Sequence, residues 1–235
     1  MKQFIPHTLS GNTFLLSSDR CIFWQEQKTL ILSDLHLGKT GHFRKAGIAV
    51  PQAIFKEDMQ RLVTLLQLYK PQQVVVIGDM FHSVDNKEHD FFIRWRKDFA
   101  QLAIMLVKGN HDILKESWYT GAGIQVCCGE DGSVSRALKI GNFVFTHDIN
   151  DPLLDPIDPS LYFFSGHIHP GISIHGLANQ SLHFPCFYFG EQYAVLPAFS
   201  RFTGTYTIKP KRGEAVYALL PNNHLKGELG GIMKV

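Results

Sequence analysis

The sequence lacks the features that mark membrane, secreted and zinc-finger proteins. No apolar run approaches the about 20 residues that a membrane-spanning helix needs. The first residues, Met1 to His7, contain no sustained apolar segment of the kind that a secretory signal carries. The four cysteines show no CxxC spacing, and two of them, Cys127 and Cys128, are neighbours. Zinc-finger chemistry is therefore disfavoured, and reduced thiols in a cytoplasmic protein are the simplest interpretation.

A strong excess of one charge is also missing. The 23 Lys and Arg residues face 21 Asp and Glu residues, which gives a net charge of +2. This balance does not require a nucleic-acid partner, although it does not oppose one. At 235 residues and 45% hydrophobic, the composition is that of an ordinary globular protein. We expect one domain over residues 1–235, with a loosely ordered tail at 221–235, and the sequence is compatible with a monomer or a dimer.

The apolar pattern predicts an α/β protein. Buried-strand runs at 29–32, 73–77 and 103–107 alternate with helical patterns at 51–69 and 86–102. This alternation implies parallel strands with right-handed crossovers. Arg94, Arg96 and Lys97 are expected on the solvated face of the second helix. Strand patterns dominate the second half, at 124–127, 142–145, 161–164, 172–174, 194–196 and 215–219.

Polar side chains follow five of these strands at the point where each strand ends. Asp34 and His36 follow the first, and Gly78-Asp79 and Gly109-Asn110-His111-Asp112 follow the next two. Thr146-His147 and Gly166-His167-Ile168-His169 follow two strands of the second half. In α/β proteins this edge of the sheet carries the chemistry, and carboxylate with imidazole is an ordinary ligand set for a divalent metal. A capping Asp beside a surface His would explain the first pair alone, but it does not explain the ordered set of five.

The order Asp-x-His, Gly-Asp, Gly-Asn-His-Asp, His and Gly-His-x-His resembles the signature of the calcineurin-like metallophosphoesterases. The resemblance implies a four-layer αββα sandwich of two mixed sheets flanked by helices. It also implies a site with two divalent metal ions, in which a hydroxide bridging the ions attacks phosphorus in line. The implied ligands of one metal are Asp34, His36 and His169, those of the other are Asn110, His147 and His167, and Asp79 bridges.

Two further residues take catalytic roles by the same resemblance. His111 matches a histidine that binds no metal, contacts the scissile phosphate and can protonate the leaving oxygen. Asp112 is expected to orient or charge His111. The ligand set contains no thiolate, which suits Mn²⁺, Fe²⁺ or Zn²⁺, and the carboxamide of Asn110 with two carboxylates makes Mn²⁺ the first choice.

Basic residues just past the first motif are candidates for substrate binding. Lys39, His42, Arg44 and Lys45 are expected in a loop at the mouth of the site, where they would bind flanking phosphates. The alternative is a solvated loop. His82 could contact a substrate phosphate or a metal-bound water, or it could cap the turn at 83–85. Phe199 and Phe202 are expected in the core rather than stacked on bases.

A closer resemblance covers nearly the whole chain. The stretches 33–39, 42–51, 78–83, 196–199 and 202–204 are similar to the ligase-associated DNA damage response endonucleases or phosphodiesterases of the PdeM type. This resemblance implies a phosphodiester substrate, with DNA first, and partners among DNA repair proteins such as a ligase or a helicase. Two alternatives stay open: a phosphatase or pyrophosphatase for a small or lipid-linked ester, and a non-catalytic scaffold with the same fold.

Overall fold

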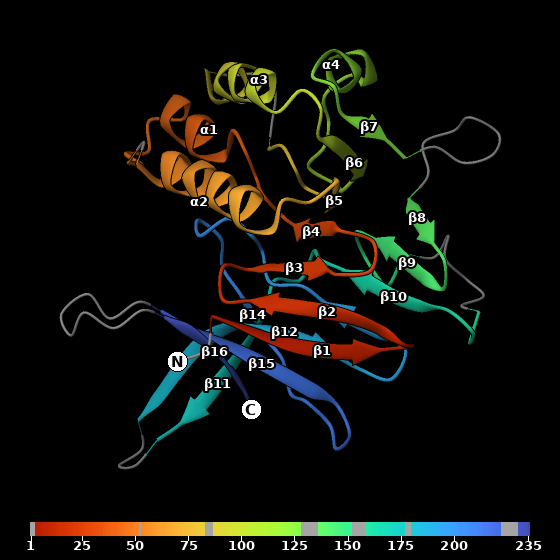
Figure 1. Cartoon of the computed structure of the whole chain (residues 1–235). Coiled ribbons are helices and arrows are strands. Elements are labelled where there is room, and N and C mark those ends of the chain that lie inside the picture. The colour runs from red at the N-terminus through yellow and green to blue at the C-terminus, as the bar shows by residue number, and fades with distance from the viewer. Residues whose placement is uncertain are drawn as a thin grey trace.

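The computed structural model describes residues 3–51, 53–82, 87–127, 136–151, 158–176, 180–221 and 230–235. Within these residues the chain forms two β-sheets packed face to face, with helices gathered on one side of the first sheet (Figure 1). No helix in these ranges combines the length and the apolarity that crossing a membrane would require.

The first sheet has seven strands whose spatial order follows the order of the chain. Neighbouring strands are antiparallel from β1 to β4 and parallel from β4 to β7. The strands are β1 (Phe4–Leu9), β2 (Asn12–Ser17), β3 (Cys21–Trp24), β4 (Thr29–Ser33), β5 (Gln73–Ile77), β6 (Ala103–Val107) and β7 (Gln125–Val126). The parallel half is the part that the alternation of strand and helix patterns predicts.

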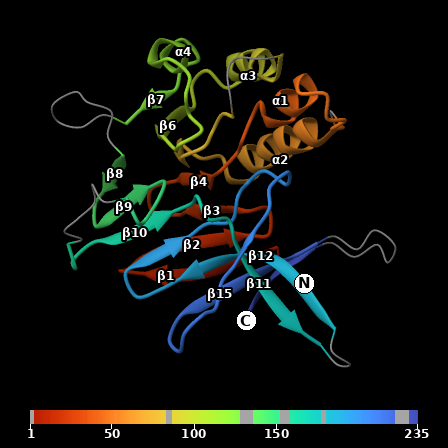
Figure 2. The same cartoon turned by 180° about the vertical axis from the view of Figure 1, so that it is seen from behind.

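Helices cover the outer face of this parallel half, as the front and rear views show (Figure 2). They are α1 (Lys39–Lys45), α2 (Ala53–Tyr69), α3 (Lys87–Asp98) and α4 (Glu116–Gly121). Leu30 and Leu32 of β4 pack in one cluster with Phe55 and Leu62 of α2. Ile31, which lies between them, packs toward the second sheet. Because both faces of β4 are covered, all five of its residues are buried.

The second sheet has nine strands. They are β8 (Ala137–Ile140), β9 (Phe143–Thr146), β10 (Tyr162–Ser165), β11 (Pro170–His175), β12 (Ser181–Phe189), β13 (Tyr193–Val195), β14 (Tyr206–Thr207), β15 (Ala215–Leu220) and β16 (Gly231–Lys234). Strand β10 runs parallel to both β9 and β13. The carboxyl ends of β9 and β10 therefore meet at one edge, where His147 and His167 follow.

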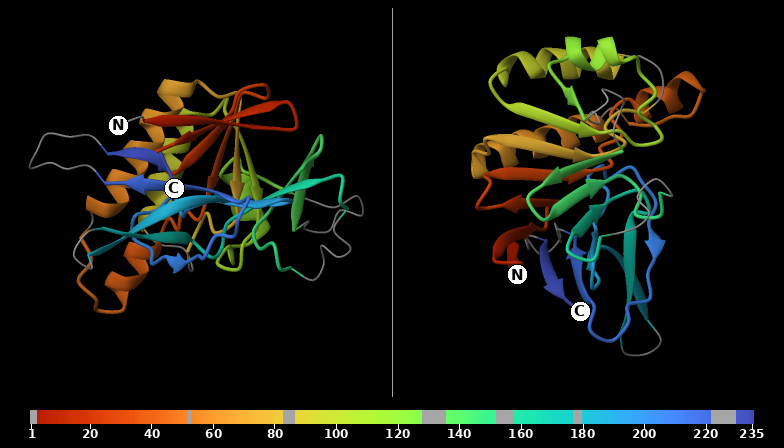
Figure 3. Two further views of the ribbon diagram at one scale, coloured as in Figure 1. Left: turned by 90° about the horizontal axis from the view of Figure 1, so that it is seen from below. Right: turned by 90° about the vertical axis from the view of Figure 1, so that its right-hand side faces the viewer.

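Aromatic side chains fill the space between the two sheets. The ring of Phe14 on β2 lies 5.2 Å from that of Phe143 and 5.1 Å from that of Phe164, between ring centroids. Phe145 stacks on Phe164 at 5.4 Å. Burial of each such ring contributes about 1.5–3 kcal/mol to stability. This core fixes the two sheets to each other, and Figure 3 shows them beneath the helices.

The expected α/β fold of two mixed sheets with helices is confirmed. Helices α2, α3 and α4 pack on the first sheet, and the described part of the chain places no helix over the outer face of the second sheet. That face instead carries a small apolar cluster that includes Ile172, Tyr188 and Val216. The fourth layer of the expected sandwich is therefore not helical in the described ranges.

Strand β12, the longest of the second sheet, is missing from the sequence-based prediction. It contains Pro185, which argues against a central strand because proline cannot donate a ladder hydrogen bond. In the structure Pro185 lies where the strand changes partners. Residues 181–185 pair with β11, and residues 186–189 pair with β15.

The expected loose tail is wrong for its last residues. Gly231–Lys234 forms β16, which pairs with β15, and Ile232 is buried in the core between the sheets. Residues 222–229 lie outside the described ranges.

The expected exposure of Arg96 is also wrong. Helix α3 ends at Asp98, and Arg96 is buried, where its guanidinium donates to the carbonyl oxygens of Phe99, Leu102 (2.7 Å) and Gly123 (3.1 Å). The side chain thus satisfies the carbonyls of the chain that follows the helix.

Candidate metal centre

Two loops carry the first three candidate ligands, and their backbones are hydrogen-bonded to each other. Asp34 N donates to Gly78 O at 3.2 Å, and His36 N donates to Asp79 O at 2.9 Å. Since β4 and β5 are parallel neighbours, their carboxyl ends lie side by side and the loops leave together. The strand pairing therefore brings Asp34, His36 and Asp79 to one place.

Five of the candidate ligands have left-handed backbone conformations. The φ angles are 53° at Asp34, 50° at His36, 47° at Asp79, 67° at His167 and 49° at His169. Residues other than glycine rarely adopt this region, and each instance costs on the order of 1–3 kcal/mol. Such strain persists where surrounding contacts over-determine the backbone, and it concentrates at functional sites.

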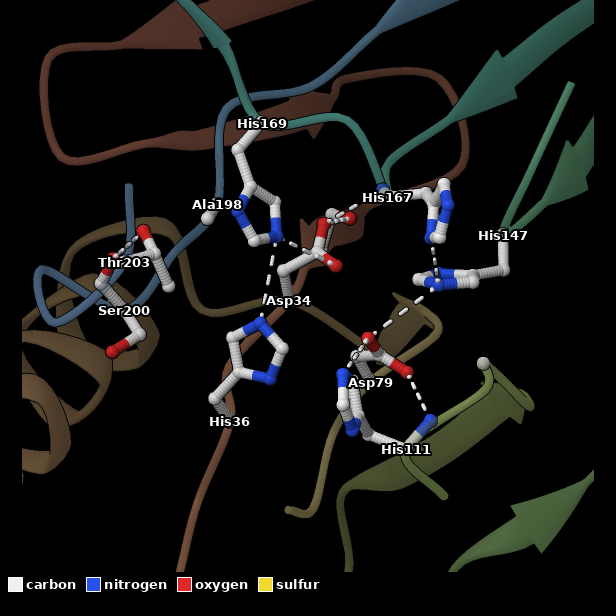
Figure 4. A network of polar contacts seen from close by, with 12 residues as sticks. Asp34, His36, Asp79, His111, His147, His167, His169, Ala198, Ser200 and Thr203 are labelled. Atoms are coloured by element: carbon white, nitrogen blue, oxygen red, sulfur yellow. Dashed lines mark hydrogen bonds and ion pairs between the residues drawn. The ribbon is translucent and has the colours of Figure 1, made fainter. Parts of the chain in front are cut away.

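One group of ligands is formed by Asp34, His36 and His169, whose ligand atoms all lie within 4.8 Å of one another (Figure 4). His169 Nε2 is 3.2 Å from Asp34 Oδ1 and 3.4 Å from His36 Nε2. Asp34 and His36 are buried. The structure thus brings together the set expected for the first metal.

A second group lies beside the first. Asp34, Asp79 and His147 also place ligand atoms within 4.8 Å of one another. His147 Nε2 is 3.5 Å from Asp79 Oδ2, 3.1 Å from Asn110 Oδ1 and 3.1 Å from His167 Nδ1. All seven expected ligands therefore meet at this edge. Asp34 lies within reach of both groups, and the bridging role of Asp79 stays a prediction.

The donor geometry fits cations rather than hydrogen bonds. Asp34 Oδ1 is buried, and the His169 Nε2 that lies 3.2 Å from it can serve either as a donor to this oxygen or as a metal ligand. Nε2 of His36 and Nε2 of His169 face each other, although a neutral imidazole has only one N–H to donate. A divalent cation bound between these atoms would be coordinated by their lone pairs, which otherwise repel each other.

The protonation states agree with this interpretation. Burial lowers the pKa of His36 to about 2, with Asp34 opposing the shift, so the imidazole is neutral at pH 7. Burial alone would raise the pKa of Asp34, but the hydrogen bond and charge of His169 outweigh it and the pKa is lowered. Metal ligation needs a neutral imidazole and an ionised carboxylate. The pKa of Asp79 is raised, chiefly by burial, so a cation there would remove part of that penalty.

Backbone carbonyls orient two of the histidines. His169 Nδ1 lies 3.3 Å from Gly204 O, and His147 Nδ1 lies 3.3 Å from Ile77 O. When each Nδ1 carries the proton, it donates to the carbonyl and leaves Nε2 free to bind a metal. The loop that contains Gly204 is therefore part of the support of the site.

Close packing at Gly166 is a further constraint. A Cβ at this position would overlap Ser33 Oγ and Asp34 Oδ2. Ser33 Oγ donates to Asp34 Oδ2, and His167 N donates to the same oxygen at 3.1 Å. Only glycine lets the loop that carries His167 approach Asp34 this closely.

His111 lies beside the metal ligands. Its backbone N–H donates to Asp79 Oδ1 at 2.8 Å, and its ring Nε2 is 4.0 Å from Asp79 Oδ2. The side chain is 43% exposed, so the ring can meet a substrate.

The structure corrects the expected contact of Asp112. Its buried carboxylate accepts from the backbone N–H groups of Gly109 (2.9 Å), Phe81 (2.9 Å) and Met80 (3.3 Å). Within the described residues it makes no hydrogen bond to the ring of His111. Asp112 therefore joins the loops that carry Asp79 and Asn110. Burial raises its pKa to about 7, and these hydrogen bonds oppose the shift.

The basic segment after the first motif is the helix α1, not a loop. Arg44 forms an ion pair with Glu88: its Nη2 lies 2.7 Å from Glu88 Oε1. The Glu88 side chain is only 2% exposed and also accepts from Gly38 N and Thr40 Oγ1. A buried carboxylate requires such partners, so Arg44 has a structural role here, and its expected substrate contact stays a prediction.

The other expected substrate-binding residues lie nearer to the centre. Burial lowers the pKa of Lys39, and Asp79 and Asp34 oppose the shift, which places its ammonium within electrostatic reach of both carboxylates. The His82 ring is half-buried and lies 4.4 Å from the His111 ring and 5.7 Å from the His42 ring, between centroids.

Three predictions remain, for Lys45, Phe199 and the turn that follows His82. Lys45 is exposed, and Phe199 is in the core as expected. The turn at 83–85 that His82 was expected to cap lies outside the described residues.

Arg136 is a candidate that the sequence does not reveal. It lines a pocket of about 500 Å³ together with Asn110, His147 and His167. Arg136 is brought next to these ligands by the pairing of β8 with β9, and sequence patterns do not determine that pairing.

This fold and this ligand set define a metal-dependent hydrolase with sites for two divalent cations. Residues 27–184, more than half of the chain, match the calcineurin-like phosphoesterase family. The chain belongs to this family and is a metal-dependent phosphoesterase, as the order of its motifs predicts.

One solved structure supports the same assignment. The nuclease MPE of Pseudomonas putida is 25% identical, with a TM-score of 0.75 over 92% of this chain and 96% of that chain. A conserved uncharacterized protein of Streptococcus pneumoniae TIGR4, described as a predicted phosphoesterase, is 14% identical over 88% of this chain and 97% of that chain. Its TM-score is 0.31, so no argument rests on it. Among curated proteins no match is found.

Proposed function

We propose that this protein is a phosphodiesterase that cleaves nucleic acid, with DNA as the expected substrate. The observation that carries the proposal is the meeting of seven oxygen and nitrogen donors with an exposed His111 beside them. The similarity to a nuclease over 92% of the chain supports the substrate class.

The residues fit two divalent ions, and we propose Mn²⁺ as the physiological metal because the donors are carboxylates, imidazoles and a carboxamide. When bound, the ions would neutralise phosphoryl charge and acidify a water molecule. Asp34, His36 and His169 would hold one ion, and Asn110, His147 and His167 would hold the other, with Asp79 shared.

The protein's own groups supply the remaining steps. The exposed ring of His111 can protonate the leaving oxygen when it carries a proton. Lys39, whose ammonium is favoured by the charges of Asp79 and Asp34 and disfavoured by burial, would attract a phosphate held at the centre. Asp112 holds the loops of Asp79 and Asn110 together through backbone hydrogen bonds, so it is a positioning residue.

The test is hydrolysis of bis-p-nitrophenyl phosphate and p-nitrophenyl phosphate by metal-stripped protein refilled with Mn²⁺, followed by oligonucleotides. A preference for the diester together with cleavage of DNA is expected. A preference for the monoester would instead favour a phosphatase or pyrophosphatase, and turnover of none of these substrates would favour a scaffold.

The cellular context is a proposal as well. A cytoplasmic role in DNA repair beside a ligase or helicase follows from the resemblance to the PdeM-type proteins. Co-purification from cells carrying a tagged chain, before and after DNA damage, tests these partners.

A further inference from the structure

Arg136 is fixed beside a candidate metal ligand by the pairing of β8 with β9. The two strands are antiparallel, and Ala137 pairs with Thr146. Extending this register by one residue sets Arg136 opposite His147. Thr146 Oγ1 also donates to Arg136 O at 3.0 Å, which holds the backbone at this point.

The guanidinium of Arg136 is oriented but largely uncovered. Its Nη1 lies 3.0 Å from Asp151 Oδ2, and the Arg136 side chain is 63% exposed whereas that of Asp151 is 10% exposed. An arginine side chain has five N–H donors, so one ion pair leaves donors for a second anion. Phosphate is the anion that a planar guanidinium binds with two parallel hydrogen bonds.

The pocket beside Arg136 opens directly onto the second ligand group. It measures about 500 Å³, within the range of pockets that bind small molecules. Asn110, His147 and His167 form its wall on the metal side. The carboxylate of Asp148, also in the wall, accepts from Asn150 N at 2.9 Å and Nδ2 at 3.2 Å.

The other cation of the pocket is less well placed. Lys108 lines the wall, but its Nζ lies 5.4 Å from the ring centroid of Tyr119. Of the two basic side chains that line this pocket, Arg136 is therefore the one that can bind a phosphate.

We propose that Arg136 binds the phosphate next to the scissile one, and that the pocket beside it holds the intervening nucleotide. This inference rests on the proposed function. It requires a substrate with at least two consecutive phosphodiesters, because a small diester has no second phosphate for Arg136 to bind. The protein would then select a polynucleotide over a short diester.

The experiment compares wild type, Arg136→Ala and Arg136→Lys, each loaded with Mn²⁺, on a fluorescent single-stranded oligonucleotide and on bis-p-nitrophenyl phosphate. Arg94→Ala is the matched control, since Arg94 is an exposed arginine on α3, in the helical layer. Arg136→Ala should lower kcat/KM about tenfold to a hundredfold more for the oligonucleotide than for the small diester. For the oligonucleotide, the slope of log kcat/KM against log salt concentration should become less negative by about 0.7 in Arg136→Ala. Arg136→Lys should retain the slope of the wild type.

Each outcome decides the proposal. Equal losses on both substrates, or no loss in Arg136→Ala, would overturn the Arg136 site while leaving a wild-type nuclease intact. A wild-type protein that hydrolyses bis-p-nitrophenyl phosphate but no oligonucleotide would overturn the proposed function, and this inference with it.

Discussion

The ion pair of Asp58 and Arg61 supports the loop behind the first ligand group, and replacing Arg61 by Met tests this support. Arg61 Nη2 lies 2.9 Å from Asp58 Oδ1, and their side chains are 8% and 5% exposed. Arg61 also donates to Phe199 O, and its guanidinium carbon lies 4.1 Å from the ring centroid of Phe199. Phe199 N in turn donates to Ser33 O at 2.7 Å, next to Asp34.

Arg61→Met leaves the carboxylate of Asp58 buried without its partner. Removing one member of a buried pair costs about 3–5 kcal/mol of the free energy of unfolding. Burial already raises the pKa of Asp58, and Arg61 is the main group that opposes the shift. When an acidic group has a higher pKa in the folded than in the unfolded protein, the free energy of unfolding falls as pH rises from the lower of these two pKa values to the higher. The penalty of Arg61→Met should therefore be smaller at pH 5 than at pH 8.

Urea unfolding of wild type, Arg61→Met, Asp58→Asn and the double variant measures these free energies at both pH values. The double variant should lose less than the sum of the single variants, because no buried charge remains unpaired. Metal titration should show about tenfold to hundredfold weaker binding in Arg61→Met, since the loop also presents Gly204 O to His169. Additive losses, or a penalty that grows on acidification, would refute the reasoning.

Three further substitutions test the centre itself. His111→Ala should keep the metal content of the wild type and lower turnover by about two to four orders of magnitude, most for substrates with poor leaving groups. Asp79→Ala should remove metal from both positions, because its carboxylate is expected to bridge, and elemental analysis measures this loss. Gly166→Ala should weaken metal binding in the same analysis, because the added Cβ overlaps Ser33 Oγ and displaces Asp34.

The contradicting results differ for each substitution. Equal losses for a p-nitrophenyl ester and an alkyl phosphodiester would argue against an acid role for His111. Two tightly held metals in Asp79→Ala would exclude the bridging assignment. Unchanged metal affinity in Gly166→Ala would show that the loop can shift without disturbing the ligands.

The sequence by itself determined which residues are the candidate ligands. Asp34, Asp79 and Asn110 each follow a buried apolar run. A run of strand-forming residues followed by polar residues is a local pattern that can be recognised in the sequence. Parallel strands place such tips at one edge, so the strand order predicts that these three motifs meet, whereas their meeting with His147, His167 and His169 was implied by the family resemblance. The same locality explains why the parallel half of the first sheet could be predicted.

Only the tertiary structure decided what the charged side chains contact. In the sequence, Arg44 and Arg96 cannot be distinguished from solvent-exposed arginines. In the structure, Arg44 pairs with buried Glu88, and Arg96 donates to a backbone carbonyl beyond the end of α3. Asp112 binds backbone amides, and Arg136 stands opposite His147 through a strand register. Long side chains reach partners far away in sequence, and the choice among partners depends on burial, which no local pattern encodes.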